Sequence, residues 1–481
     1  MSNFRKRFSI ESLETRQLMA GDLAAYVMNG NLYINEAAGQ TGLDNGVRVS
    51  QLANGMIRVE GAEANDGTND KSLVNGAAYQ DFMVPGDLVV KLGAGNDRLH
   101  LGYDGGFGSP SFNNISINMA APEPVLTQRM LTSAKLGPSI FNAPDDDQLM
   151  GWGFHSRGVT NVNTGAGNDW VFIGRALVGD GYGTDKLTVN SGAGADNVTM
   201  KGTTVLGGAY ITTYANASEN DSDVVWFDST FDGNFNLVPT NITGNSEIYM
   251  GGGADGFYIS DPNDPYYLSV GLKTLGSMHL NTGAGDDVVD IAAAAFGDDN
   301  HWSNLSIYTM GGADDVTVDF SSSLIEIGQT APNLTGGLFI HTYGSIYEND
   351  ADVVRIPVAQ VEASTYVYLG GGNDVFELTA GNWGNDLTVD AGAGNDTGYL
   401  GGFLWDDVFL RMGEGDDNLT LGHVNANVMN YDGGAGVDRL RKEQVLAYDY
   451  LYQTGWEYIN GRPTWWDDII WQPIGGGVFA P

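Results

Sequence analysis

The chain has 481 residues, and its 42% apolar and 11% aromatic content is enough for a hydrophobic core, which argues against general disorder. Sixty acidic residues against 22 basic ones give a net charge of -38, which repels nucleic acid and anionic lipid and attracts cations. Cysteine is absent, so disulfides, a thiol nucleophile and Cys-ligated metals are excluded. No apolar run reaches the roughly 18 residues that a membrane-spanning helix needs.

Residues 1–22 are expected to be an N-terminal export segment. Arg5, Lys6 and Arg7 are typical of the start of a signal peptide, but the apolar stretch that should follow is missing. Instead, 13–20 reads Leu-Glu-Thr-Arg-Gln-Leu-Met-Ala, which resembles the Leu-Glu-Pro-Arg-x-Leu-Leu-Ala signature at the start of many large exported proteins of planctomycete bacteria. The resemblance implies a secreted or cell-surface destination. The alternative is a short disordered start.

Two hairpins are predicted next, because Asn-Gly between alternating apolar runs is a strong hairpin signal. The first spans 25–34 around Asn29-Gly30, and the second spans 46–60 around Asn54-Gly55. We expect them to begin a repeat array and to cover its first edge.

The main feature of the chain is a turn of the form Gly-x-Gly-x-Asp, which occurs eleven times and is followed each time by a short alternating run. Gly165-Ala-Gly-Asn-Asp169 is a clear copy, whereas Gly311-Gly-Ala-Asp-Asp315 has Ala at the second Gly position. Such repetition predicts stacked structural units with a column of acidic groups. The closing aspartates are Asp97, Asp169, Asp185, Asp196, Asp255, Asp287, Asp315, Asp374, Asp396, Asp417 and Asp438.

The spacing of these turns predicts the fold. From Asp374 to Asp438 the steps are 22, 21 and 21 residues, with weaker turns ending at Asp386, Asp407 and Asn427 between them. Each half-step is a turn followed by a few alternating residues, which is typical of a short half-buried strand. We therefore expect an all-β parallel β-solenoid, similar to a β-helix or β-roll, over 23–445, with about 21–30 residues per coil.

Three irregularities interrupt the period. The two 59-residue gaps, Asp196 to Asp255 and Asp315 to Asp374, each suit two coils, with a degraded turn at Asp223 and at Asp352 that lacks the glycines. Residues 102–159 are expected to be an insertion with a candidate short helix at 125–134. Such an insertion is either a binding loop or a loop without function.

Residues 446–481 are expected to form an aromatic cap that hides the last coil, as a repeat array requires. The alternative for these rings is stacking against sugars. The aromatic residues concerned are Tyr448, Tyr450, Tyr452, Trp456, Tyr458, Trp465, Trp466 and Trp471.

The turn contains the chemistry that calcium requires. Glycines permit a tight turn that directs carbonyls inward, and the aspartate adds a carboxylate on the same side. Calcium takes six to eight such oxygens, so two successive turns would share one ion. Carboxylates stacked about 5 Å apart repel by up to about 3 kcal/mol per pair, which favours a counter-ion. We expect calcium at the eleven aspartates. In the alternative, stacked Asn and Asp hydrogen-bond to the neighbouring backbone without metal.

Two segments strengthen the calcium hypothesis. Gly370-Gly-Gly-Asn-Asp-Val-Phe376 and Asp432-Gly-Gly-Ala-Gly-Val-Asp-Arg-Leu440 resemble the haemolysin-type calcium-binding repeat, Gly-Gly-x-Gly-x-Asp-x-(aliphatic)-x. That resemblance implies a parallel β-roll filled by calcium in a secreted bacterial protein. The chain departs from that family because its steps are mostly 21 residues or more, whereas the family repeats about every nine.

Catalytic motifs are absent from the sequence. The six histidines form no His-Glu-x-x-His, and neither a Gly-x-Ser-x-Gly elbow nor a phosphate-binding loop occurs. The expected function is a secreted or cell-surface calcium-binding repeat protein with a structural or interaction role. Extracellular polysaccharide and other surface proteins are its candidate partners. The alternative is a polysaccharide lyase or epimerase of the β-helix type, with Lys201, Arg355 or Arg411 as its base.

Overall fold

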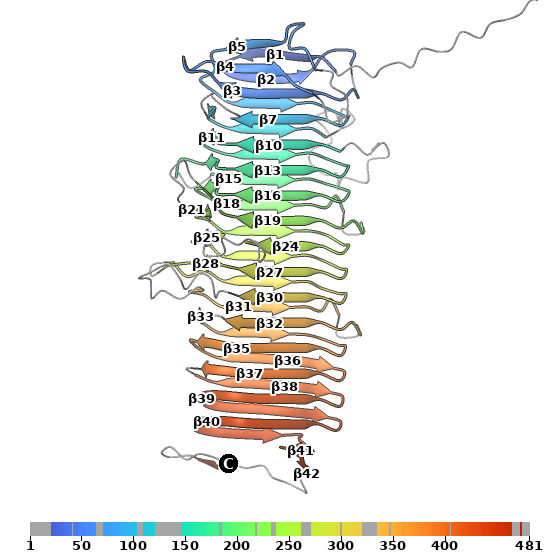
Figure 1. Ribbon diagram of the computed structural model, residues 1–481, viewed down its shortest axis with the longest axis vertical. Coiled ribbons are helices and arrows are strands. Elements are labelled where there is room, and N and C mark those ends of the chain that lie inside the picture. The colour runs from blue at the N-terminus through green and yellow to red at the C-terminus, as the bar shows by residue number, and fades with distance from the viewer. Residues whose placement is uncertain are drawn as a thin grey trace, which may run out of the picture.

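The computed structural model describes most of the chain (Figure 1). The export segment at 1–20, the candidate helix at 125–134 and the tryptophans at 465, 466 and 471 lie outside the described residues. Those residues are 21–40, 42–63, 71–102, 109–120, 146–181, 185–216, 219–231, 237–260, 271–298, 301–319, 334–345, 348–358, 360–404, 406–463 and 472–473.

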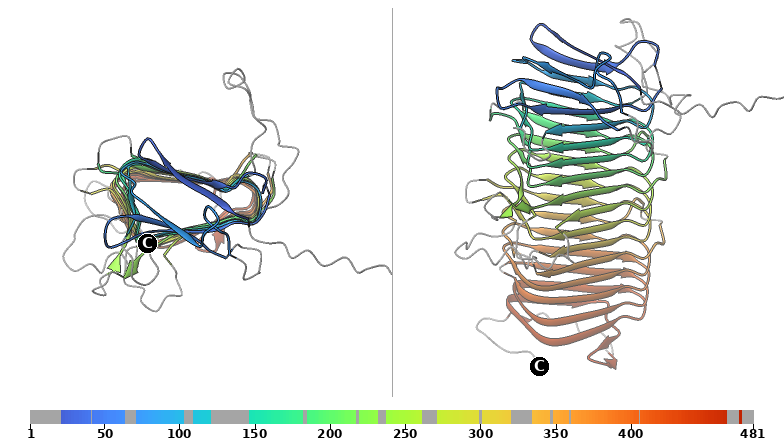
Figure 2. Two further views of the ribbon diagram at one scale, coloured as in Figure 1. Left: turned by 90° about the horizontal axis from the view of Figure 1, so that it is seen from above. Right: turned by 45° about the horizontal axis from the view of Figure 1, so that its top comes forward.

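The described residues form an all-β fold of stacked coils, as in a β-solenoid, and most strands pair in parallel with the strands one coil before and one coil after. Seen along the stack, the coil is flattened, with two long sides (Figure 2). The predicted all-β, mostly parallel architecture is confirmed. Within the described residues, no helix has the length and apolarity to cross a membrane.

In the first long sheet, each strand directly follows the turn that carries a glycine-rich motif or its degraded equivalent. It is built from β7 (Arg98–Gly102), β10 (Gln148–Trp152), β13 (Trp170–Gly174), β16 (Asn197–Lys201), β19 (Val224–Asp228), β24 (Gly256–Ile259), β27 (Val288–Ala292), β30 (Asp315–Asp319), β32 (Val353–Val358), β35 (Val375–Trp383), β37 (Thr397–Leu404) and the first parts of β39 (Asn418–Ala435) and β40 (Arg439–Thr454).

The second long sheet precedes those turns and lies on the opposite side of the coil. It is built from β6 (Leu88–Lys91), β9 (Ile115–Asn118), β12 (Thr160–Asn163), β15 (Lys186–Asn190), β18 (Gly208–Thr212), β23 (Ser246–Tyr249), β26 (Met278–Asn281), β29 (Leu305–Tyr308), β31 (Leu338–His341), β34 (Thr365–Tyr368), β36 (Leu387–Ala393), β38 (Val408–Glu414) and the later parts of β39 and β40.

A short sheet closes the coil between the two long ones. Its strands are β8 (Ser111–Phe112), β11 (His155–Ser156), β14 (Leu177–Val178), β17 (Thr204–Val205), β22 (Thr240–Ile242), β25 (Leu272–Thr274) and β28 (Ala294–Phe296). The remaining short strands are β20 (Thr230–Phe231), β21 (Leu237–Val238), β33 (Gln360–Val361), β41 (Tyr458–Ile459), β42 (Arg462–Pro463) and β43 (Gln472–Pro473).

Alternation along each strand produces the core. In β15, Leu187 and Val189 are fully buried while their neighbours are partly exposed, because successive side chains of a strand point to opposite faces. The same inward positions are aliphatic or aromatic in coil after coil, so a continuous apolar ladder fills the stack. Complete burial of one such side chain contributes about 1.5–3 kcal/mol.

Both predicted hairpins are confirmed at the N-terminal end. β1 (Leu23–Met28) pairs antiparallel with β2 (Asn31–Glu36), and β3 (Gly46–Gln51) pairs antiparallel with β4 (Ile57–Gly61). β4 also pairs antiparallel with β5 (Tyr79–Phe82). β2 and β3 continue in parallel into β6 and β7, so the hairpins are joined directly to the first coil.

Part of the range 102–159, expected to be an insertion, instead belongs to the stack. β8, β9, β10 and β11 all lie in this range and pair in parallel with the coils around them. The reason is that inward residues such as Ile115, Ile117 and Leu149 continue the buried ladder. Residues 103–108 and 121–145 of this range lie outside the described residues.

At the C-terminal end, β40 runs past position 446, where the cap was expected to begin. Tyr448 and Tyr450 are exposed on it, whereas Trp456 is buried and packs edge-on against Tyr431 at 6.5 Å. The described part of the expected cap therefore includes both exposed and buried aromatic rings.

Candidate metal centre: the aspartate column

Thirteen buried aspartates, one from each successive coil, form a continuous column at the edge where the second long sheet turns into the first. In each step, the backbone N–H of one aspartate donates to Oδ1 of the aspartate in the next coil, at 2.8–3.0 Å. None is more than 2% exposed. We call this set the aspartate column: Asp97, Asp147, Asp169, Asp196, Asp223, Asp255, Asp287, Asp314, Asp352, Asp374, Asp396, Asp417 and Asp438.

The column continues into a different residue at each end. The N–H of Asn45, in the N-terminal hairpins, donates to Oδ1 of Asp97 at 2.7 Å. At the other end, the N–H of Asp438 donates to Oε2 of Glu457 at 2.8 Å. The ladder therefore runs without a break from the first to the last coil.

Nine of the eleven predicted aspartates lie in the column, and Asp185 and Asp315 do not. Asp185 precedes β15 at another corner of its coil, where its Oδ2 accepts the N–H groups of Asp180 and Gly181 at 2.8 and 3.0 Å. Its carboxylate therefore closes a local loop instead of stacking on the next coil.

Asp315 is displaced by one residue. Met310, with φ of 69°, occupies the first glycine position, and Gly312 occupies the second, so the column residue is Asp314. Asp315 starts β30, points outward and forms an ion pair with Arg355 at 2.7 Å. The alignment of this turn in the sequence analysis was wrong because two adjacent glycines and two adjacent aspartates allow either register.

Four column members were not predicted as ligands: Asp147, Asp223, Asp314 and Asp352. Asp223 and Asp352 are the aspartates of the two degraded turns, and both are hydrogen-bonded to the coils before and after them. In both, Val-Val follows the aspartate, as it does after Asp287. That apolar run, not the glycines, was the available signal.

The glycine turns allow the coils to stack closely. Gly394, with φ of 132°, lies so near the previous coil that an added Cβ would be 1.4 Å from the carbonyl oxygen of Gly372. Only glycine fits there, for steric reasons as well as for its positive φ. The stacking distance at this edge therefore depends on the absence of side chains.

A second, outer ladder runs beside the column in the opposite direction. In it, the residue just before a column aspartate donates its N–H to the side chain of its counterpart in the preceding coil; Asn168 donates to Asp146 at 2.8 Å, and Asp416 to Asn395 at 2.7 Å. Hydrogen bonding of stacked Asn and Asp to the neighbouring backbone, one of the two alternatives above, is thus present. In the column, these backbone bonds use only Oδ1 of each aspartate. They do not provide a hydrogen-bond donor for Oδ2.

The second carboxylate oxygen, Oδ2, distinguishes two kinds of column residue. In Asp223, Asp287 and Asp352, Oδ2 accepts a hydroxyl from Thr213, Thr282 and Thr342 respectively, each at 2.5 Å. The carboxylates of Asp196 and Asp314 likewise lie beside the hydroxyls of Ser191 and Thr309, which offset part of the rise that burial causes in their pKa values. In six others Oδ2 is buried and has no hydrogen-bond partner: Asp97, Asp255, Asp374, Asp396, Asp417 and Asp438. None of the ion pairs found within the described residues involves the column.

Burial without a basic partner raises the pKa values of the column. Desolvation is the main cause, and it raises the pKa of Asp196 and Asp314 to about 9 and that of Asp255 to about 8. The pKa of Asp374 and Asp396 is raised to about 7, again chiefly by burial, with neighbouring column carboxylates adding to the shift. At neutral pH, Asp196, Asp255 and Asp314 therefore retain their protons unless a cation is bound.

The column fits calcium in its donor chemistry, because buried carboxylate oxygens that no N–H or O–H group satisfies are the ligands that a hard cation prefers. Two successive aspartates and the carbonyls of the glycine turns are the groups that would hold an ion. Among the described residues, no three column carboxylates converge, so carbonyl oxygens would have to complete the coordination.

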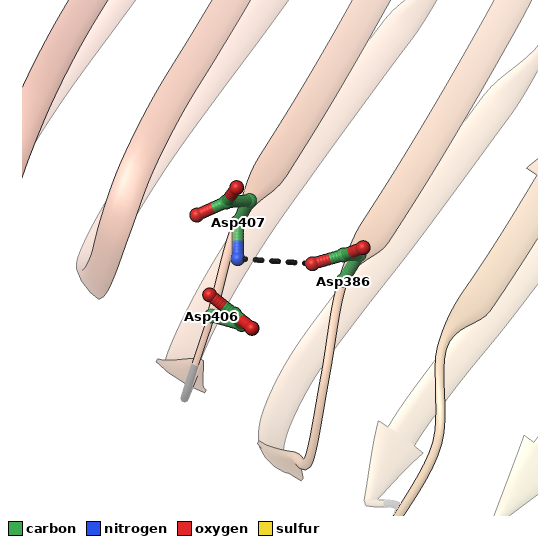
Figure 3. Close-up of side chains that lie close together, drawn as sticks. All are labelled: Asp386, Asp406 and Asp407. Carbon is green, nitrogen blue, oxygen red and sulfur yellow. Dashed lines mark hydrogen bonds between the residues drawn. The ribbon is translucent and has the colours of Figure 1, made fainter.

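Three carboxylates do converge elsewhere. Asp386, Asp406 and Asp407 are the only group of three or more His, Cys, Asp or Glu in the described chain whose ligand atoms all lie within 4.8 Å of one another. The N–H of Asp407 also donates to Oδ1 of Asp386 at 3.3 Å (Figure 3). We call these residues the acidic triad. Sequence analysis noted the turns at Asp386 and Asp407 but did not predict that they carry ligands.

The three candidate catalytic bases do not share a site. Lys201 pairs with Asp228 at 2.9 Å and Arg355 with Asp315 at 2.7 Å, on different coils of the first long sheet. Arg411 lies near Asp390 at 3.7 Å on the second long sheet. These residues therefore provide no constellation in which a base faces a carboxylate-bound substrate.

The chain matches no model of a known protein family, no curated protein and no solved structure.

Proposed function

We propose that this protein is a calcium-binding structural rod of the cell exterior, in which the aspartate column takes up calcium and the ion rigidifies the stack. The observation that carries the proposal is the run of buried Oδ2 atoms that lack a hydrogen-bond donor. A buried carboxylate without a partner is unfavourable in its charged form, so a bound divalent cation would remove a large cost.

Calcium would act as a structural ion, with no catalytic role. Binding requires ionised carboxylates, so it would release the protons that the raised pKa values hold at neutral pH. An ion that binds the folded stack and not the unfolded chain stabilises the fold by about 2.7 kcal/mol per site at a hundred times its Kd.

Three further properties support an extracellular structural role. The net charge of -38 attracts cations, the coils are regular, and 13–20 resembles an export signature. The lyase or epimerase alternative is less well supported, because Lys201, Arg355 and Arg411 are paired separately on different coils.

The test is thermal unfolding of the full chain at pH 8, followed by circular dichroism, with millimolar calcium or with a chelator. We expect calcium to raise the melting temperature by several degrees, with magnesium much less effective. An unchanged melting temperature would refute the proposal.

Two variants locate the ion. Asp396→Asn keeps an oxygen for the N–H of Asp374 but removes the ionisable group from the column, so it should lower the number of calcium ions bound in equilibrium dialysis. Asp386→Asn is the matched control in the acidic triad. If only Asp386→Asn lowered the number bound, the ion would belong to the triad and not to the column.

A further inference from the structure

A row of aromatic rings crosses six successive strands on the outer face of the second long sheet. Consecutive ring centroids are 5.8, 5.6, 5.0, 5.1 and 4.7 Å apart. We call this row the aromatic strip: Tyr210, Tyr249, His279, Tyr308, His341 and Tyr368.

The register between coils places the rings in two ways. At the start of the strip they are diagonal neighbours, because Tyr210 and His279 both pair with Glu247 and not with Tyr249. Tyr308 lies directly beside His341, and His341 beside Tyr368, in the parallel pairings of β29, β31 and β34. Phe339 and Tyr366 add a parallel ring pair in the same two strands, at 5.2 Å and 8°. At about 4.8 Å per coil, the strip is on the order of 25 Å long, which is much longer than a single sugar unit.

The rings are held in place yet accessible. Tyr210 is 40% exposed, and the others are partly exposed. Each ring contacts the next, so their positions are fixed before any ligand arrives, which lowers the entropic cost of binding. Burial lowers the pKa of His341, so its imidazole is uncharged at neutral pH and presents a neutral aromatic face.

Polar groups flank the rings within the same face. The Tyr249 hydroxyl donates to Glu247 at 3.4 Å, and the strip ends beside Asp390, which faces Arg411 in the next coil. Beyond the Tyr210 end of the strip, the equivalent outward positions carry a ladder of amides, in which Asn190 donates to Asn163 at 2.9 Å. The consecutive rings are tilted by 38–54° to one another. A continuous row of such rings edged by hydrogen-bonding groups is complementary to a molecule with apolar ring faces and hydroxyl edges.

We propose that the aromatic strip binds an uncharged polysaccharide chain, which lies along the long axis of the stack with its sugar rings against the tyrosines. The repeat of the strip matches a repeating polymer better than a globular partner. The net charge of -38 repels polyanionic glycans and opposes association of two copies of this chain. This inference is independent of cation binding by the aspartate column, which lies at the turns and not on this face.

The test is retention of the full chain on uncharged polysaccharides, namely cellulose, xylan, mannan and starch, with alginate and pectate as charged probes. All measurements are made in calcium-containing buffer, so that the column is in one state throughout. We expect retention by at least one uncharged polysaccharide and by neither charged one. Retention by none of the uncharged set, or only by alginate or pectate, would overturn the proposal.

Three variants separate ring stacking from loss of fold. Tyr308→Ala should weaken binding by about tenfold, since aromatic contacts contribute up to about 1.5 kcal/mol. Tyr308→Phe keeps the ring and should retain most of the affinity. Tyr258→Ala, an outward ring of β24 on the first long sheet, is the control and should bind like the unaltered chain.

Each variant is checked by its melting temperature and by sedimentation. Equal losses in Tyr258→Ala and Tyr308→Ala would overturn the proposal, because the effect would not be confined to the strip. If the unaltered chain self-associates and Tyr308→Ala abolishes that self-association, the strip would instead bind a second copy of the chain.

Discussion

A column aspartate uses its two carboxylate oxygens for different purposes. Oδ1 accepts the N–H of the preceding coil in all thirteen, and this bond replaces water for a buried backbone group. Oδ2 accepts a threonine hydroxyl in three of them and lacks a donor in six. The first oxygen therefore joins the coils, and the second makes the column responsive to protons and cations.

At this scale, the neighbours Asp314 and Asp315 should behave very differently. At pH 5, Asp314 is protonated and uncharged, because its pKa is about 9. Asp314→Ala therefore removes the acceptor of the Asp287 N–H without relieving any charge repulsion. It should cost about 1–3 kcal/mol of the free energy of unfolding. Asp315→Ala removes only an exposed pairing with Arg355 and should cost less than about 1 kcal/mol.

Denaturant unfolding of both variants at pH 5 measures the difference. A larger loss in Asp315→Ala would mean that the register of this turn is the one suggested by the sequence and not the one in the structure.

At the scale of the element, the glycine-rich turn combines a backbone requirement with a steric one. Both glycines of a turn have positive φ, and in most turns both lie directly against a carbonyl of the coil before it. Met310 shows that the first position tolerates a side chain at φ of 69°. In the turn of Asp396 both positions are closed to a side chain, because an added Cβ would lie 1.7 Å from the Gly370 oxygen at Gly392 and 1.4 Å from the Gly372 oxygen at Gly394.

Gly394→Ala and Gly181→Ala separate these two requirements. Both glycines have positive φ, but an added Cβ meets nothing within 4 Å at Gly181 and lies 1.4 Å from the Gly372 oxygen at Gly394. Gly181→Ala should cost about 1–2 kcal/mol from backbone strain alone. Gly394→Ala should cost at least about 2 kcal/mol more, because the coils must separate.

Thermal unfolding in calcium gives this comparison directly. Equal costs would show that positive φ, and not close stacking, is what requires glycine in the turn.

At the scale of the whole molecule, the column makes stability depend on pH in the direction opposite to that of paired carboxylates. The folded-state pKa values of the column, about 6 to 9, lie above the value near 3.8 of a free aspartate. The folded state therefore binds more protons than the unfolded state between these values. The contribution of the column to the free energy of unfolding is complete below about pH 4 and is lost as the pH rises through the folded-state pKa values, about 6 to 9.

In a chelator, the free energy of unfolding should thus fall from pH 5 to pH 9. Each group contributes up to about 1.4 kcal/mol per pH unit within its own window. Burial also raises the pKa of Asp290 and Asp390, outside the column, so these two groups add to the slope in the same direction. Denaturant unfolding at pH 5, 7 and 9 measures it, and stability that increases over this range would contradict the assignment.

The matched control for this slope is the double variant Asp196→Asn with Asp314→Asn, which removes the two groups whose pKa is raised to about 9. It should flatten the fall between pH 7 and pH 9. Calcium should flatten the same region in the unaltered chain, because the ion replaces the protons.

Local features of the sequence were enough for the fold class, the N-terminal hairpins and nine members of the column. Asn29-Gly30 and the glycine turn of Asp396 can be recognised locally, because positive φ and strand alternation depend on a few adjacent residues.

Only the tertiary structure decided which aspartates stack on one another. Asp147, Asp223 and Asp352 lack the glycines and join the column through bonds to residues 22 to 50 positions away. The strip is equally non-local, since Tyr308 and His341 meet only through the pairing of β29 and β31. Loops of unequal length separate successive strands, so the register between coils is set by packing along the whole stack and not by any short pattern.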